Sequence, residues 1–337
     1  MEKGIMLKVL DDEKAIKKYR RQFIKSFKPF IDEKIPVNLG HPGGTVKAKV
    51  AWSNVLGVWI FQEKISDSRY WHAFGMGKPS KSSHIPTTCE INFPIRGIDR
   101  RIGGALAADR YGRIFVVHRG KIGGGKKGIG KSLFEDNYRG VWTTMEDGPF
   151  ESKVALIGVL NSPRFVRQVT QFVRKINRIK DLSYQSSQLE ITFDELLFRE
   201  EIIGAEFDTA EARLNLKDEC DHGLVVLDLY TALNSHGFKV ANDLTRDLFT
   251  LSKKGRIADV FQIVPDVSIA GINWATAHLL LNAVDLPERP RLILSIPEAI
   301  DQSLEAKLKK LGIDVLVYKW QRDHAMFSNL RALICQS

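Results

Sequence analysis

The stretch from Asp247 to Val264 is the part of this 337-residue sequence that most constrains the fold. Two apolar runs, rich in β-branched and aromatic residues, flank the polar segment Lys253–Arg256. Apolar runs of this kind, separated by a short turn that contains Gly, are typical of a β-hairpin. The stretch therefore predicts two paired strands in the C-terminal half of the chain.

Helical and strand-like segments lie on both sides of this hairpin. An amphipathic segment, 222–236, precedes it, and Asp221 is the expected N-cap of that helix. Strands separated by helical crossovers imply an α/β sheet that is covered on both faces. The segments after the hairpin are a helix over 274–284, a strand over 291–296, a helix over 304–311 and a strand over 315–320.

In this order, the segments between about residues 221 and 320 resemble the core of the restriction-endonuclease-like, or PD-(D/E)XK, nuclease superfamily. In that superfamily, an Asp on the first strand and a Glu-x-Lys on the second hold a divalent metal and activate water. Asp247 matches the Asp here, whereas Gln262 and Val264 stand at the Glu and Lys positions. His278 takes the place of a Gln that the family often carries on the next helix. The resemblance implies a nuclease scaffold with a degenerate site.

The degenerate positions argue against catalysis. Acidic oxygens hold Mg²⁺, and a Lys polarises the attacking water. Gln262 offers one neutral oxygen and Val264 offers none. We therefore expect a catalytically silent fold, without a cofactor, that is kept for binding or assembly.

An active endonuclease with migrated carboxylates is the alternative, with Mg²⁺ as its cofactor and Asp247 as a metal ligand. Asp228, on the preceding helix, is the first candidate for a migrated ligand. Asp259 and Asp266 are weaker candidates, because strand alternation places Asp259 on the opposite face from Gln262.

The charge balance indicates a polyanionic partner. The chain has 50 Lys and Arg against 40 Asp and Glu, a formal net charge of +10, which favours nucleic acid. No apolar run reaches the ~18 residues of a membrane span, and the N-terminus does not resemble a signal peptide. Cys89, Cys220 and Cys335 are too few for a disulfide framework or a zinc knuckle. We expect a cytoplasmic protein that binds nucleic acid, more readily DNA, and no membrane, with a protein partner or a homodimer left open.

The N-terminal half is expected to be rich in β-structure. From Val37 to about Thr144, short β-like runs alternate with Gly turns, which predicts a small barrel or a curled sheet. Amphipathic helices are predicted over 13–30 and 162–179. The expected fold is thus α+β with two domains. They are a basic β-rich module over 1–180, a linker over 181–205, and a restriction-endonuclease-like α/β domain over 206–337.

The densest basic stretch runs from Arg100 to Gly140, with ten Lys and Arg against three Asp and Glu. Such a segment suits phosphate contacts, which give sequence-independent affinity. Aromatic side chains that line an open pocket of this module could stack on bases. The candidate phosphate contacts are Arg100, Arg101, Arg119, Lys121, Lys126, Lys127, Lys131 and Arg139, and the stacking candidates are Trp52, Trp59, Tyr70 and Trp71.

Residues Gly125–Ser132 match the P-loop pattern G-x-x-x-x-G-K-S, and Leu224–Asp228 supplies a Walker-B-like string. A P-loop lies between a buried strand and a full-length helix. Only the short segment 133–138 follows this loop, and the Walker-B-like string is expected on a helix. Nucleotide binding therefore remains a minor alternative to a phosphate clamp. The favoured interpretation is a nucleic-acid-binding protein of prokaryotic defence, such as phage defence, or of DNA processing.

Overall fold

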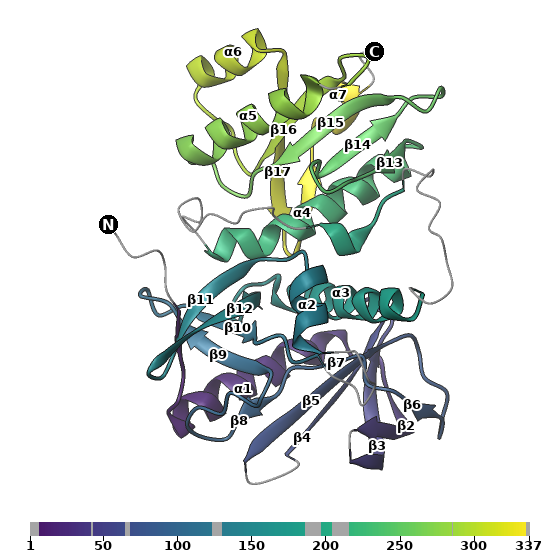
Figure 1. The fold of residues 1–337 in the computed structure, drawn as a ribbon. Coiled ribbons are helices and arrows are strands. Elements are labelled where there is room, and N and C mark those ends of the chain that lie inside the picture. Colours follow the sequence, from purple (N-terminus) through teal and green to yellow (C-terminus); the bar gives the residue numbers. More distant parts are fainter. Residues whose placement is uncertain are drawn as a thin grey trace. The chain divides into compact units, whose positions relative to one another are not determined.

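In the computed structural model, the described residues are 7–41, 43–64, 68–122, 130–185, 197–203, 216–284 and 286–334. The chain divides into two compact units, Met1–Glu190 and Ile191–Ser337 (Figure 1). Helices and strands occur in both, so the predicted α+β class is confirmed.

The N-terminal unit contains an amphipathic helix, α1 (Glu13–Phe27). Asp12 caps it, because its carboxylate accepts a hydrogen bond from the backbone N–H of Ala15 at 2.8 Å. Apolar side chains at helical spacing, such as Phe23, are buried in the core of the unit. A proline in the short 3-10 helix η1 (Lys28–Phe30) ends α1.

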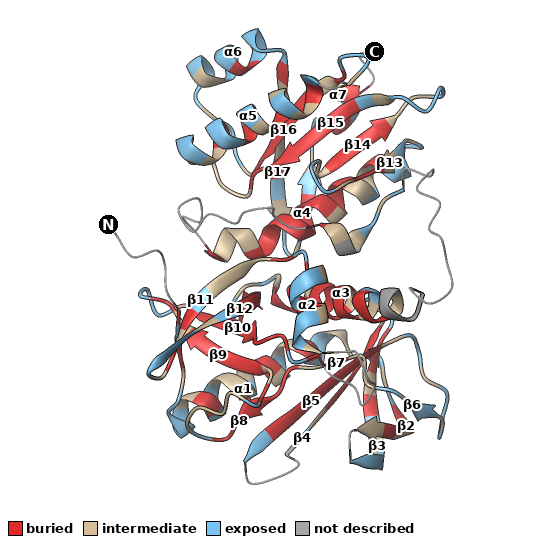
Figure 2. Cartoon of the chain, viewed as in Figure 1, coloured by how far each residue is buried: buried red, intermediate tan, exposed pale blue. Residues whose placement is uncertain are grey.

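Five strands of this unit close into a small barrel. They are β1 (Leu7–Val9), β9 (Gly104–Ala108), β10 (Ile114–His118), β11 (Trp142–Asp147) and β12 (Phe150–Val159). Their order is β1-β11-β12-β10-β9, and β1 closes the ring by pairing with both β11 and β9. Figure 2 shows β9 and β10 almost entirely buried. The predicted barrel is therefore present, in the sense of a small closed sheet.

A second, seven-stranded sheet has the order β6-β2-β3-β4-β5-β7, with β8 paired to β5. Its strands are β2 (Glu33–His41), β3 (Gly44–Ser53), β4 (Val58–Lys64), β5 (Arg69–Met76), β6 (His84–Ile85), β7 (Cys89–Glu90) and β8 (Phe93–Pro94). The ring of His41 on β2 lies 5.7 Å from that of Trp71 on β5, although these strands are not neighbours. The sheet is therefore curled, and its inner face packs on itself.

The curled sheet depends on a close approach between Trp59 and Gly75. These two residues face each other on β4 and β5. A Cβ atom on Gly75 would lie 2.2 Å from the Trp59 ring, so only glycine leaves room for the indole. The inner face then buries an aromatic cluster made of Trp52, Trp59, Phe61 and Trp71.

Helix α3 (Phe165–Gln185) packs against β12 and β5. The sequence favours Ser162 as its N-cap, but the helix begins three residues later, and the Ser162 hydroxyl accepts a hydrogen bond from Arg164 N–H at 3.2 Å just before it. The helix runs six residues further than the predicted end at 179. The start of the predicted linker, 181–185, is thus helical, because neither Gly nor Pro interrupts the sequence there.

The C-terminal unit contains a six-stranded sheet in the order β13-β14-β15-β16-β17-β18. β13 to β15 are antiparallel, β15 to β17 are parallel, and β18 is antiparallel to β17. One apolar core lies between the sheet and α4, and another lies under α5 and α6. The elements are α4 (Leu216–Ser235), β13 (Lys239–Ala241), β14 (Leu248–Leu251), β15 (Ile257–Ile263), α5 (Ile269–Val284), β16 (Arg291–Ile296), α6 (Gln302–Lys310), β17 (Ile313–Gln321), β18 (His324–Phe327) and α7 (Leu330–Ile334).

The hairpin predicted from the sequence is β14–β15. Its turn includes Gly255 at a φ of 75°, a backbone conformation that favours glycine. Asp221 is not an N-cap as predicted, because α4 already begins at Leu216. Acidic residues in its first turn, including Asp218, favour this earlier start by interacting with the helix dipole.

Candidate functional site

A polar cluster surrounds Asp247, at the start of β14. Its Oδ2 accepts hydrogen bonds from Ile263 N–H at 2.8 Å and from the Gln262 amide at 2.7 Å. His222 Nε2, from α4, lies 3.1 Å from the same carboxylate. The side chains of His222 and Asp247 are 10% and 14% exposed, so the group is nearly but not fully enclosed. We call Asp247, His222, Gln262 and His278 the Asp247 cluster.

Gln262 connects Asp247 to α5. Its Oε1 accepts a hydrogen bond from His278 Nδ1 at 2.8 Å, while its amide nitrogen donates to Asp247. The ring of Trp274 stacks on that of His278, with 4.7 Å between centroids and 18° between planes. The amide oxygen that could have faced a metal ion therefore faces an imidazole N–H.

Val264 lies in the apolar core under α5 and is 4% exposed. It contributes only methyl groups at the family's Lys position, and a lysine there would be buried in an apolar environment. Gln262 and Asp247 are in contact, whereas Val264 is part of the core.

The migrated-carboxylate alternative has no support from the positions of the acidic residues. Asp228 accepts a hydrogen bond from Ala325 N–H, on β18, at 2.7 Å, and β18 is at the far edge of the sheet from β13 and β14. Asp259 binds the Arg291 guanidinium and the Thr250 hydroxyl. Among the described residues, no three His, Cys, Asp or Glu side chains form a group that could hold a metal ion. Asp228, the first candidate of that alternative, thus contacts β18 and not Asp247 in the contacts described above.

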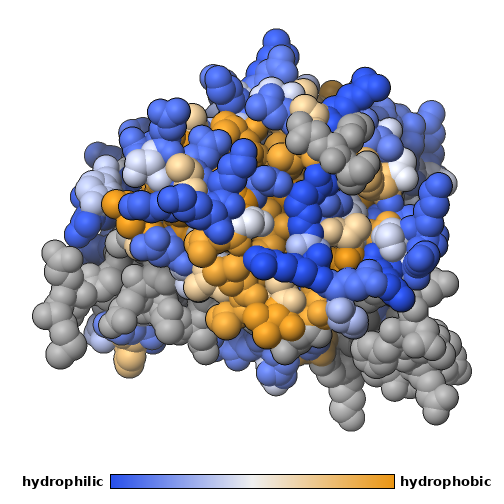
Figure 3. Space-filling model, turned by 90° about the horizontal axis from the view of Figure 1, so that it is seen from above, coloured by the Kyte–Doolittle hydropathy of each residue, from blue (hydrophilic) through white to orange (hydrophobic). Residues whose placement is uncertain are grey.

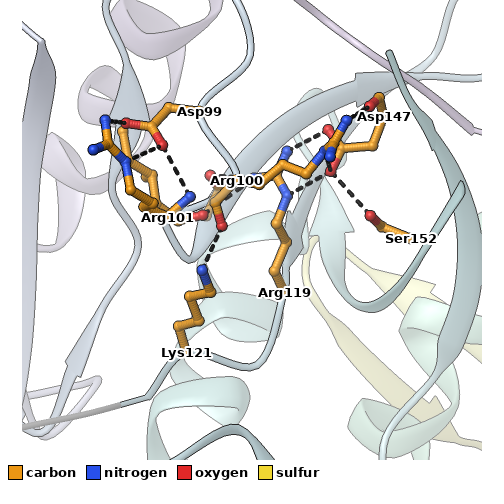
Figure 4. Close-up of polar contacts among 9 residues, drawn as sticks. Asp99, Arg100, Arg101, Arg119, Lys121, Asp147 and Ser152 are labelled. Carbon is orange, nitrogen blue, oxygen red and sulfur yellow. Dashed lines mark hydrogen bonds and ion pairs between the residues drawn. The ribbon is translucent and has the colours of Figure 1, made fainter. Parts of the chain in front are cut away.

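In the N-terminal unit, part of the basic stretch comes together beside the barrel (Figure 4). Arg119, a predicted phosphate contact, is only 6% exposed. Its Nε and Nη2 donate to the two carboxylate oxygens of Asp147 at 2.9 and 2.7 Å, and Nη1 donates to the carbonyls of Ile102 and Gly104. Arg119 is thus a structural residue. Its assignment to phosphate binding is corrected, because its charge is neutralised inside the unit.

Asp147 is fully buried and also accepts a hydrogen bond from the Ser152 hydroxyl at 3.0 Å. Burial disfavours the charged form of this carboxylate, but the hydrogen bonds and charge of Arg119 outweigh burial and lower its pKa. The loop around Arg100 is attached to the same carboxylate-bearing strand, because Arg100 Nη2 donates to the carbonyl of Asp147 at 3.1 Å.

Other cations of the stretch remain at the surface. Arg101 has a side chain that is 90% exposed, and it pairs with Asp99 through Nε at 3.1 Å. This hydrogen bond is the main reason why the pKa of Asp99 is lowered. Lys121 is also exposed, and its Nζ donates to the carbonyl of Arg100 at 2.6 Å. Figure 4 shows these side chains as one group.

An aromatic ring that the sequence interpretation missed lies next to them. The Arg100 guanidinium is 3.8 Å from the centroid of the Phe150 ring, and Phe150 is 56% exposed. The only signal in the sequence was an aromatic residue directly after the turn Asp147–Pro149, and its contact with Arg100 depends on the fold. We call Arg100, Arg101, Lys121 and Phe150 the Arg100 surface.

The remaining predicted phosphate contacts are less closely grouped. Lys131 pairs with Glu135 at 3.2 Å and is 55% exposed at its side chain. Arg139 is exposed, and its carbonyl accepts a hydrogen bond from Lys175. Lys126 and Lys127 lie outside the described residues, as does most of the P-loop-like segment.

The helix α2 (Lys131–Asn137) that follows this segment has only seven residues, and the Walker-B-like string lies within α4 rather than on a strand. The short helix and the helical position of the Walker-B-like string are both as expected from the sequence.

The four predicted stacking residues are in the core. Trp52, Trp59, Tyr70 and Trp71 are 6%, 2%, 7% and 3% exposed. Their large apolar rings are buried by the curled sheet and the helices that cover it. They cannot stack on a base in this structure, and this assignment is corrected.

Comparison of the chain with models of known protein families, with curated proteins and with solved structures found no match. No helix in the described part of the chain is long and apolar enough to span a membrane.

Proposed function

We propose that this protein binds nucleic acid, more readily DNA, through the Arg100 surface of its N-terminal unit. The observation that carries this proposal is the grouping of two exposed cations, Arg101 and Lys121, with the partly exposed Arg100 on loops next to the barrel. The exposed ring of Phe150, the first residue of β12, lies against Arg100. Arginine and lysine provide phosphate contacts, and an aromatic ring can stack on a base. The net charge of +10 adds long-range attraction for a polyanion.

We further propose that the C-terminal unit is a restriction-endonuclease-like domain. The order of its elements supports this, since α4 is followed by three antiparallel strands, the crossover helix α5 and the parallel strand β16. The contact between Asp247 and Gln262 also supports it, because the family needs the corresponding two side chains on one metal. A role in prokaryotic defence or DNA processing follows from this resemblance.

The domain is proposed to be catalytically silent. An Asp carboxylate that already accepts hydrogen bonds from a backbone N–H and from the neutral Gln262 amide is a weak Mg²⁺ site. Its role would be binding or assembly, with a protein partner or a second copy of the chain as open possibilities.

Fluorescence anisotropy with a labelled DNA duplex tests the binding proposal. Affinity should fall steeply as salt rises from about 50 to 200 mM. The double substitution Arg101→Ala with Lys121→Ala should weaken binding and reduce the slope of log affinity against log salt by about 2. Phe150→Ala should weaken binding of single-stranded DNA more than binding of the duplex, because only unpaired bases can stack on it.

The matched control is Lys307→Ala with Lys309→Ala, which removes the same charge from exposed positions of α6. If the two double variants lost equal DNA affinity, only the net charge of the protein would determine binding. That result, or binding that does not respond to salt, would contradict the proposed surface.

A further inference from the structure

A cleft in the C-terminal unit lies away from the Asp247 cluster. Its volume is about 590 Å³, which is within the range of roughly 300 to 1,000 Å³ that small-molecule sites occupy. It is formed by the end of β14, the start of β15, the loop before β13, and α7. Asp247 stands at the other end of β14, so the cleft is separate from the nuclease-like positions.

Buried polar groups form one side of this cleft. Asp259 and Thr250 are 6% and 1% exposed, and the Thr250 hydroxyl donates to the Asp259 carboxylate. Arg291 donates to Asp259 from Nε and Nη2 at 2.8 and 2.6 Å, and Nη1 donates to the carbonyl of Leu333. These groups fix one another, so this side of the cleft is rigid and is neutralised by its own ion pair.

Apolar and cationic groups form the rest of the lining. Phe238, Leu251, Ala258 and Ile334 provide the apolar contacts. Lys239 on β13 and Lys253 in the hairpin turn are both exposed. Because Asp259 already neutralises Arg291, the two lysines leave the cleft with a positive charge.

The position of the lysines follows from the backbone. Gly237, with a φ of 83°, ends α4 and turns the chain so that Phe238 and Lys239 reach the sheet edge. Lys239 is then directly opposite Leu251 in the antiparallel pair β13–β14. A cation and an apolar side chain are thus neighbours, an arrangement that suits a ligand carrying both kinds of group.

We propose that this cleft binds a small organic anion, in which one acidic group is attached to a flat apolar body. The acidic group contacts Lys239 and Lys253, and the apolar body packs against Phe238, Leu251 and Ala258. This inference does not depend on nucleic-acid binding, since none of these residues belongs to the Arg100 surface.

The test uses 8-anilino-1-naphthalenesulfonate, which has this chemistry, and N-phenyl-1-naphthylamine, which has the same rings without the charge. Titration of the full chain, followed by probe fluorescence, should show saturable binding of the anionic probe. Lys239→Gln with Lys253→Gln should lower the affinity for the anionic probe about tenfold, because each exposed charge contact contributes modestly. The affinity for the neutral probe should change less than about twofold. Ala258→Phe, at an exposed position that lines the cleft, should lower the affinity for both probes.

The control is Lys307→Gln with Lys309→Gln on α6, and circular dichroism confirms that each variant is folded. Absence of saturable binding by the wild type would overturn the proposal. So would anionic-probe affinities that are the same in the cleft variants and the α6 control.

Discussion

Two carboxylates, Asp147 in the N-terminal unit and Asp247 in the C-terminal unit, show how differently the two units treat a buried charge. Asp147 is fully buried and is bound by both arms of the Arg119 guanidinium. Asp247 is 14% exposed at its side chain and is held by an amide, a backbone N–H and His222. The first charge is cancelled by a permanent cation, and the second is stabilised mainly by hydrogen bonds.

This difference separates structural from accessible charge. A buried ion pair with its hydrogen bonds satisfied on both sides is not accessible to a ligand, so Arg119 and Asp147 hold the barrel to its loop. Asp247 has no Arg or Lys hydrogen-bonded to it among the contacts described above, and its side chain keeps some contact with solvent. Position in a basic run or in a motif therefore does not decide a residue's role. That role depends on the charges of the side chains that contact the residue in the fold.

The largest expected effect is loss of the Arg119–Asp147 pair. Arg119→Met should destabilise the protein by about 3 to 5 kcal/mol, because it removes the doubly hydrogen-bonded cation of a buried carboxylate and leaves only the longer contact with Arg100, at 3.8 Å. Arg101→Met breaks an Arg–Asp pair that is 90% exposed at the arginine, and it should change the stability far less, because solvent screens the pair. Urea unfolding measures both variants. If the two variants lost similar free energies of unfolding, burial of the Arg119–Asp147 pair would not contribute to its effect on stability.

Buried histidines of the N-terminal unit give the next effect. Burial lowers the pKa of His72 to about 3 and that of His118 to about 4. The charge of Arg20, whose Nε donates to His72 Nε2 at 3.2 Å, acts in the same direction. As the pH falls below ~6.5, the pKa of histidine in the unfolded chain, these histidines become protonated in the unfolded chain but stay neutral in the folded unit.

Stability is therefore fully present above pH ~6.5 and falls by about 2 kcal/mol for each of these histidines by pH 5. His72→Gln should be less stable than the wild type at pH 7 but should lose about 2 kcal/mol less between pH 7 and pH 5. Urea midpoints at the two pH values measure this difference. An unchanged pH dependence would show that His72 is protonated in the folded protein.

The sequence predicted what depends on local pattern. Turn residues and apolar runs located the β14–β15 hairpin, and helical spacing located α1. Long-range pairing was not predictable in this way. β1 closes the barrel by joining strands more than a hundred residues away, such as β11, and its three residues carry no distinctive pattern. The strands β11 and β12 were also largely missed, because polar residues such as Thr144 and Lys153 interrupt their alternation.

The candidate sites show the same limit. The meeting of Asp247 with Gln262 was predictable, since both belong to one hairpin and their spacing sets the register. The burial of Arg119 was not, because it depends on Asp147, which is distant in sequence. A run of basic residues looks uniform in the sequence, and only the fold divides it into buried and exposed members.

The smallest expected effect concerns the Asp247 cluster, and it tests whether that carboxylate can take up a metal. Gln262→Glu places a second carboxylate where an amide now donates to Asp247 at 2.7 Å. Without metal, the two negative charges should repel, and the loss of the hydrogen bond should lower stability by about 1 to 2 kcal/mol. With Mn²⁺ or Mg²⁺, a pair of carboxylates becomes a usable set of oxygen ligands, and the loss should be recovered. Thermal unfolding with EDTA or with metal measures both effects.

The wild type is the matched control, and its melting temperature should not respond to either metal. It should also show no Mg²⁺-dependent cleavage of plasmid DNA. Val264→Lys is a poor route to the full family motif, because a lysine in the core under α5 would have to lose its charge or disrupt the packing. Metal-dependent cleavage by the wild type that is lost in Asp247→Ala would contradict the silent-site proposal. In that case Asp247 would resemble Asp147 only in being held by its neighbours, and its charge would serve catalysis.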